Sequence, residues 1–230
     1  TERHWNVGEV GRIPWHEQIS EIDVLTSYAK EQYQTLLNER IYDPVSPYYM
    51  GPAILPESHV EGYFFDHPHH QKVAEDLELD FNPNSRTTSI PELVRNAEMA
   101  KRRRRQRTEE LAREIDDALF EAFEISESTR EKVRTEIFLR TVEDPEDRNV
   151  PDPDTVPESP ENIDQYASDL VHHFALESIR QEDDGIIPLH DTDDQANMHD
   201  LIIERFEEAY GEYAEDRLVE VDQILGSQSA

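Results

Sequence analysis

The 230-residue chain contains no cysteine, seven glycines and four lysines. The lack of cysteine excludes disulfides, thiolate metal sites and a cysteine nucleophile. No apolar run approaches the roughly 18 residues of a membrane span, and the first residues lack the apolar segment of a signal peptide. We therefore expect a soluble, cytoplasmic protein with no membrane partner.

Motifs of common catalytic and nucleotide-binding sites are also missing. The sequence has no G-x-G-x-x-G or G-x-x-x-x-G-K-[ST] loop to hold a phosphate, and no G-x-S-x-G turn to present a serine nucleophile. We assign no catalytic and no cofactor-binding residue from the sequence.

Acidic residues dominate the charge. The chain has 53 Asp and Glu against 22 Lys and Arg, a formal net charge of −31. Acidic residues in place of lysine are typical of proteins adapted to molar salt, where the Debye length falls to about 3 Å and carboxylate repulsion is screened. An acidic, partly disordered interaction segment is the alternative. Regular apolar periodicity favours the halophilic, folded interpretation.

Apolar spacing of three and four residues predicts a mainly α fold. We expect a helical hairpin and a C-terminal helical bundle, preceded by a short extended segment over 1–16 that ends near Pro14. Ser89 and Ser126 are placed to precede the two hairpin helices. The expected helices cover 19–37, 90–124, a stretch after 126, 163–174, 198–210 and 218–225.

Proline and charge divide the chain into four regions. Five prolines among acidic residues mark 142–160 as a linker. The predicted regions are an N-terminal junction and helix (1–57), a hairpin with a basic patch (58–141), the linker (142–160) and an acidic helical region (161–230).

The most concentrated positive charge is the run KRRRRQR at 101–107. A basic helical patch on an acidic protein is expected where phosphates are bound, and arginine can hold a phosphate through two hydrogen bonds. Ion pairing with acidic faces of the same fold or of a subunit is the alternative. The candidate residues for contact with double-stranded DNA are Arg86, Arg95, Lys101, Arg102, Arg103, Arg104, Arg105 and Arg107.

Histidines are concentrated around one proline. Imidazoles next to a carboxylate could bind a divalent metal, but Pro68 excludes a regular helical ligand pair through this segment, and no H-E-x-x-H spacing is present. Such a run is also typical of a polar loop. We assign no metal site; the residues that could form one are His59, His67, His69 and His70, followed by the His172–His173 pair and the acidic turn at 190–194.

Four segments, in order, resemble the C-terminal region of large adenine-specific DNA methyltransferases of type IIG restriction-modification and bacteriophage-exclusion (BREX) systems. They are RHWNVGEVGRIPW (3–15), ELAREIDDALFEAFEIS (110–126), DDGIIPL (183–189), and YGE with ILG (210–212, 224–226). In the second segment, Glu124 stands where the family has glycine and Phe123 where it has tyrosine.

The resemblance implies a noncatalytic part of such an enzyme. The family's N-P-P-Y motif holds the flipped adenine, whereas this chain has Asn82-Pro83-Asn84-Ser85 and no motif for S-adenosylmethionine, which the missing domain would bind. The implied partners are duplex DNA and the catalytic part or other subunits of a phage-defence system. Two alternatives stay open: a halophilic protein-interaction module without a DNA role, and a metal-dependent hydrolase that uses the histidine cluster.

Overall fold

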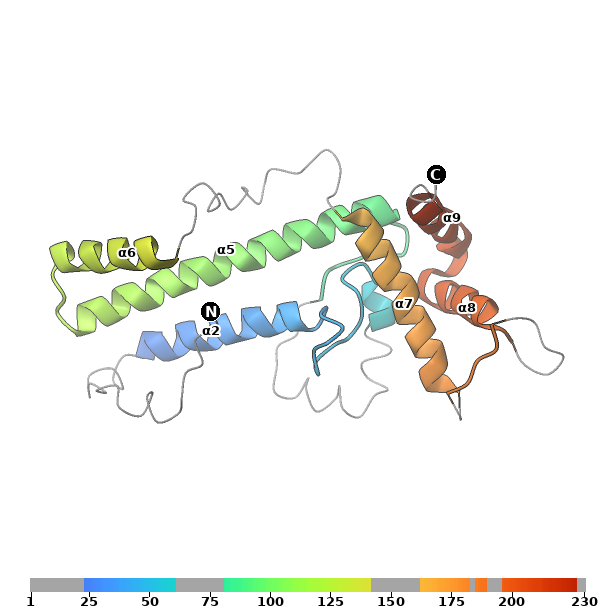
Figure 1. The fold of residues 1–230 in the computed structure, drawn as a ribbon, viewed down its shortest axis with the longest axis horizontal. Helices are drawn as coiled ribbons and strands as arrows, with labels where there is room; N and C mark the ends of the chain where they lie inside the picture. The colour runs from blue at the N-terminus through green and yellow to red at the C-terminus, as the bar shows by residue number, and fades with distance from the viewer. Residues whose placement is uncertain (1–22, 61–80, 142–161, 183–184, 190–195, 227–230) are drawn as a thin grey trace. The chain divides into compact units, whose positions relative to one another are not determined.

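The computed structural model describes residues 23–60, 81–141, 162–182, 185–189 and 196–226. Every regular element in these ranges is helical (Figure 1), which confirms the mainly α prediction. The predicted extended segment at 1–16 and the linker at 142–160 lie outside the described residues. The chain forms two compact units, Thr1–Tyr33 with Arg107–Val150 (unit 1) and Gln34–Gln106 with Pro151–Ala230 (unit 2).

Most helices begin and end close to the predicted positions, but the helix predicted at 163–174 continues to Gln181 and the one predicted at 218–225 already begins at Ala214. Gly211, with φ 59°, ends α8 as expected, because glycine has no Cβ to oppose this left-handed backbone. The elements are α2 (Asp23–Arg40), α5 (Ile90–Ala122), α6 (Glu127–Thr141), α7 (Ile163–Gln181), α8 (Met198–Tyr210), the 3₁₀ turn η3 (Gly211–Tyr213) and α9 (Ala214–Gly226).

In unit 1, the end of α5 and α6 form the predicted hairpin. Glu124 ends α5 in a left-handed conformation with φ 51°, and the Ile125 N–H donates to the Phe120 carbonyl across this turn. Ser126 then precedes α6, and its carbonyl accepts from the N–H groups of residues 129 and 130.

Side chains also join α5 to α6. Arg134 pairs with Asp117, and its guanidinium lies over the Phe120 ring. Polar and aromatic contacts therefore join the two helices.

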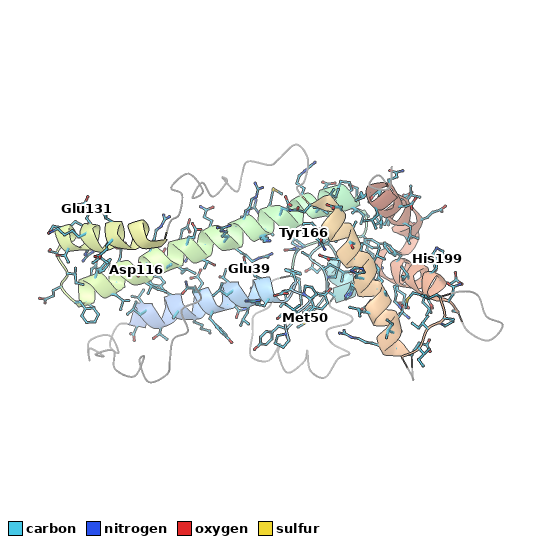
Figure 2. All side chains as sticks on the ribbon, in the orientation of Figure 1. Glu39, Met50, Asp116, Glu131, Tyr166 and His199 are labelled. Atoms are coloured by element: carbon cyan, nitrogen blue, oxygen red, sulfur yellow. The ribbon has the colours of Figure 1, made fainter. Side chains whose placement is uncertain are left out.

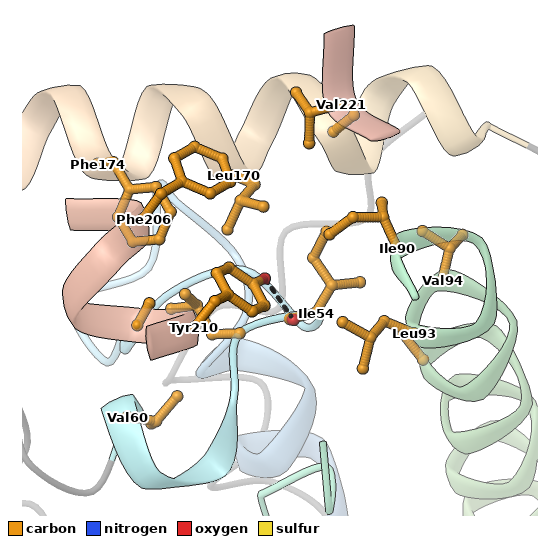
Figure 3. Close-up of a cluster of buried hydrophobic side chains, with 14 of the residues drawn as sticks. Ile54, Val60, Ile90, Leu93, Val94, Leu170, Phe174, Phe206, Tyr210 and Val221 are labelled. Carbon is orange, nitrogen blue, oxygen red and sulfur yellow. Dashed lines mark hydrogen bonds between the residues drawn. The ribbon is translucent and has the colours of Figure 1, made fainter. Parts of the chain in front are cut away.

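In unit 2, α7, α8 and α9 form the C-terminal bundle around an apolar core (Figure 3). Phe174, Phe206 and Tyr210 are fully buried, and the ring centroids of Phe174 and Phe206 are 4.8 Å apart. The first turns of α5 and the segment 41–60 complete this core. The Tyr210 hydroxyl donates to the Ile54 carbonyl at 3.4 Å, so even the largest polar ring of the core has a partner.

The apolar stripe predicted over 19–37 is only partly buried. Leu37 is buried in α2, whereas Tyr33 and Leu36 are 58% and 46% exposed. Periodic spacing determines which side chains share a helix face, but it does not determine whether another element covers that face. Residues 19–22 of this predicted helix lie outside the described residues.

Candidate functional site

Three cations of the 101–107 run project to solvent from α5. Lys101, Arg103 and Arg105 are exposed. Lys101 and Arg105 are four residues apart and share one helix face, while Arg103 projects in another direction. These three side chains are accessible to a polyanion from solvent.

Arg104 instead packs within unit 2. Its Nη1 donates to Asn82 Oδ1 at 3.2 Å, and its guanidinium carbon lies 5.4 Å from the centroid of the Tyr42 ring. The charge of Arg104 also acts on Tyr166 of α7 (labelled in Figure 2): burial raises the pKa of Tyr166, and Arg104 partly offsets this rise. Arg104 therefore holds the unit 2 part of α5 against Tyr42 and Asn82 of the same unit.

Arg107 is engaged by carboxylates of unit 1. It donates to both carboxylate oxygens of Glu31, at 2.7 and 3.1 Å, and it lies 3.3 Å from a Glu114 oxygen. The hydrogen bond from Arg107 lowers the pKa of Glu31, and the hydrogen bond to Glu31 raises the pKa of Arg107. Arg107 thus forms the ion pair within the fold that the sequence analysis gave as the alternative to DNA contact.

The two outlying candidates also lie in unit 2. Arg86 is exposed, and its Nε donates to the Ser58 hydroxyl at 3.0 Å. Arg95 on α5 is half-buried, and its buried Nε has no hydrogen-bond partner among the described residues. Of the eight predicted DNA contacts, four are exposed (Arg86, Lys101, Arg103 and Arg105), Arg95 and Arg102 are half-buried, and Arg104 and Arg107 make contacts within their own units.

A second cluster lies inside unit 2 and joins α7 to the helical turn at 57–60. His173 and Glu177 share one face of α7, four residues apart, with Nε2 and Oε1 separated by 3.4 Å. His59 from the 57–60 turn places its Nε2 3.5 Å from Glu177 Oε2. The ligand atoms of these three residues all lie within 4.8 Å of one another.

This cluster is buried. The side chains of His173 and Glu177 are each 3% exposed, and that of His59 is 13% exposed. Burial would raise the pKa of Glu177, but the adjacent imidazoles of His173 and His59 outweigh burial and lower this pKa to about 2. Glu177 is thus a carboxylate held in its charged form among side chains that can each bind a cation.

The sequence identified one member of this cluster. His59 was among the candidate ligands, whereas His67, His69 and His70 lie outside the described residues. His173 stands in the sequence next to His172, which is exposed and lies outside the cluster. The predicted helix at 163–174 ends before Glu177, so the sequence does not place this residue one turn from His173, and their approach to His59 is a tertiary contact that spacing cannot show.

The segment Asn82-Pro83-Asn84-Ser85 has a structural role. The Asn84 amide donates to the carbonyls of Ala53 and Leu55 at 2.8 and 2.9 Å, and the Asn82 amide donates to the Ala53 carbonyl at 2.9 Å. Both asparagines are buried. Their amides are therefore occupied in bracing the backbone at 53–55.

Comparison with known proteins assigns no relative: no family model, curated protein or solved structure matches this chain. Among the described helices, none combines the length and apolar character that crossing a bilayer requires.

Proposed function

We propose that this chain is a noncatalytic helical portion of an adenine-specific DNA methyltransferase of the BREX or type IIG kind, and that it contacts the DNA backbone. The observation that carries the proposal is the exposed set of cations Lys101, Arg103 and Arg105 on α5 of a protein with a net charge of −31. The order of the four sequence segments similar to this family supports the assignment.

In the proposed function, the cations of α5 have two different roles. Arg104 and Arg107 hold α5 through Asn82, Tyr42 and Glu31, while the three exposed cations bind phosphates. Phosphate contacts position a duplex and carry no base readout, so the target sequence is read elsewhere. A separate catalytic part in the cytoplasm binds S-adenosylmethionine, flips the adenine and methylates it.

A protein-interaction module is the second candidate function. Arg107 already binds the carboxylate of Glu31 through two hydrogen bonds, so the same run can recognise acidic protein surfaces. In that case, a partner subunit of the defence system would cover the exposed cations in place of DNA.

The test compares two triple variants of the full chain in binding to a fluorescent duplex. Lys101→Gln/Arg103→Gln/Arg105→Gln removes the exposed cations of the run, and Lys30→Gln/Arg113→Gln/Lys132→Gln removes three exposed cations elsewhere. We expect the first variant to lose on the order of 10- to 100-fold in affinity at about 0.2 M salt, as three phosphate contacts predict. Equal affinities of the two variants would contradict the DNA role and favour the protein-interaction module.

A further inference from the structure

We propose that His59, His173 and Glu177 form a buried Zn²⁺ site with three protein ligands. The site lies within unit 2, joins the helical turn at 57–60 to α7, and is independent of the proposed DNA contact.

The ligand atoms lie close enough to reach one ion: His173 Nε2 is 3.4 Å from Glu177 Oε1, His59 Nε2 is 3.5 Å from Glu177 Oε2, and all three ligand atoms lie within 4.8 Å of one another. A tetrahedral Zn²⁺ with ligands at about 2.0–2.1 Å separates neighbouring ligand atoms by about 3.3–3.4 Å. His59 Nε2 and Glu177 Oε2, moreover, are buried with no hydrogen-bond partner among the residues that the structure describes.

The His173 ring is fixed on two sides, by close packing against Gly51 and by a contact at its other nitrogen. A Cβ added at Gly51 would lie 2.4 Å from Leu55 Cδ1 and 3.2–3.3 Å from His173 Cε1 and Nε2, so only glycine fits between the Leu55 side chain and the His173 ring. The Tyr49 hydroxyl lies 3.4 Å from Nδ1. Metal-binding histidines commonly use their second nitrogen for such an outer contact, which orients the ring.

The donor set determines the class of metal. Two imidazoles and one carboxylate suit Zn²⁺ and its first-row neighbours, whereas Ca²⁺ and Mg²⁺ prefer oxygen ligands alone. Three protein ligands leave one position of a tetrahedral ion for water. Because two of the ligands are 3% exposed, we assign the ion to holding the 57–60 turn against α7 rather than to open catalysis.

The test uses the full chain, stripped of metal by a chelator and titrated calorimetrically with Zn²⁺ in molar KCl. The salt suppresses weak binding of Zn²⁺ to exposed carboxylates. We expect one Zn²⁺ per chain, a higher thermal unfolding midpoint when Zn²⁺ is bound, and a visible spectrum typical of four-coordinate Co²⁺ when Co²⁺ is used instead. Absence of stoichiometric Zn²⁺ binding to the wild-type chain would overturn the proposal, whatever the behaviour of any variant.

Variants then assign the ligands. We expect His173→Ala and Glu177→Gln to lower Zn²⁺ affinity by about 100-fold or more and Tyr49→Phe to lower it by about 10-fold. His172→Ala, which removes the exposed neighbouring imidazole, is the matched control and should bind as the wild type does. Glu177→Gln keeps the shape of the side chain, so circular dichroism of this variant separates loss of metal from loss of fold. Unchanged affinity in Glu177→Gln, or equal losses in His172→Ala and His173→Ala, would overturn the site.

Discussion

Asn84 is a single residue whose role comes from its buried hydrogen bonds and could not be read from the Asn82-Pro83-Asn84-Ser85 sequence. Its side chain is buried, and both contacts of its amide nitrogen are donations to backbone carbonyls at 53–55. An amide can serve this position because it offers two N–H donors. Aspartate has nearly the same shape but offers only acceptors when ionised.

Asn84→Asp should therefore lower the free energy of unfolding by about 2 kcal/mol, because two carbonyls lose their donor and face a carboxylate. The exposed Asn96 on α5 gives the matched control, Asn96→Asp. Chemical denaturation of the two variants measures the difference. Equal stabilities would show that the Asn84 contacts do not stabilise unit 2.

Glu124 is a residue in a conformation that favours glycine. Glu124 follows the end of α5 with a φ of 51°, and the methyltransferase family that this segment resembles has glycine at the same position. Glu124→Gly should raise the free energy of unfolding by about 0.5–1 kcal/mol, since a left-handed backbone opposes a Cβ. Glu121→Gly, in the same exposed stretch of the helix end, should instead lower stability by about 1 kcal/mol. Thermal melts that show both variants destabilised equally would contradict this account of the turn.

At the scale of elements, α9 caps the start of α5. Glu220 accepts the Ile90 N–H at 2.7 Å, and Arg217 of α9 donates to the same carboxylate oxygen at 3.0 Å. A carboxylate at a helix N-terminus satisfies a free N–H and complements the helix dipole. Ser89, the cap expected from the sequence, does precede α5, but the charged partner of this helix end comes from 130 residues further along the chain.

Glu220→Ala should cost about 1 kcal/mol of stability, because it removes this cap and leaves Arg217 buried without its acceptor. Asp222→Ala, an exposed acidic residue on the same helix, should have little effect. Guanidinium denaturation would compare them, and a loss that is equal for both substitutions would argue against the cap.

Helix positions could be predicted from the sequence because they depend on local signals. Gly211 ends α8, Ser126 precedes α6, and the apolar spacing from Ile90 onward continues to the end of α5. The pairing of Glu220 with Ile90, and of His59 with Glu177, could not be predicted, because both depend on which distant segments the core brings together. Likewise, seven neighbouring positions of one basic run gave no sign that Arg104 and Arg107 would be anchors while Lys101 and Arg105 stay exposed.

At the scale of the whole molecule, the net charge of −31 predicts a protein that needs salt. Raising KCl from about 0.1 M to about 1 M shortens the Debye length from about 10 Å to about 3 Å and so weakens carboxylate repulsion. We expect the thermal unfolding midpoint to rise over this range by several degrees. Sucrose at matched osmolality screens no charge and should raise the midpoint less; a midpoint that does not respond to KCl would contradict the halophilic interpretation.

The salt dependence of DNA binding counts the counterions that the protein releases and therefore measures how many phosphates α5 contacts. For the full chain on a short duplex, the slope of log K against log salt should be steeper than for Lys101→Gln/Arg103→Gln/Arg105→Gln by about 2–3, at about 0.9 per lost contact. The variant Lys30→Gln/Arg113→Gln/Lys132→Gln should keep the wild-type slope. If both triple variants show the wild-type slope, α5 does not contact phosphates and the proposed function is wrong.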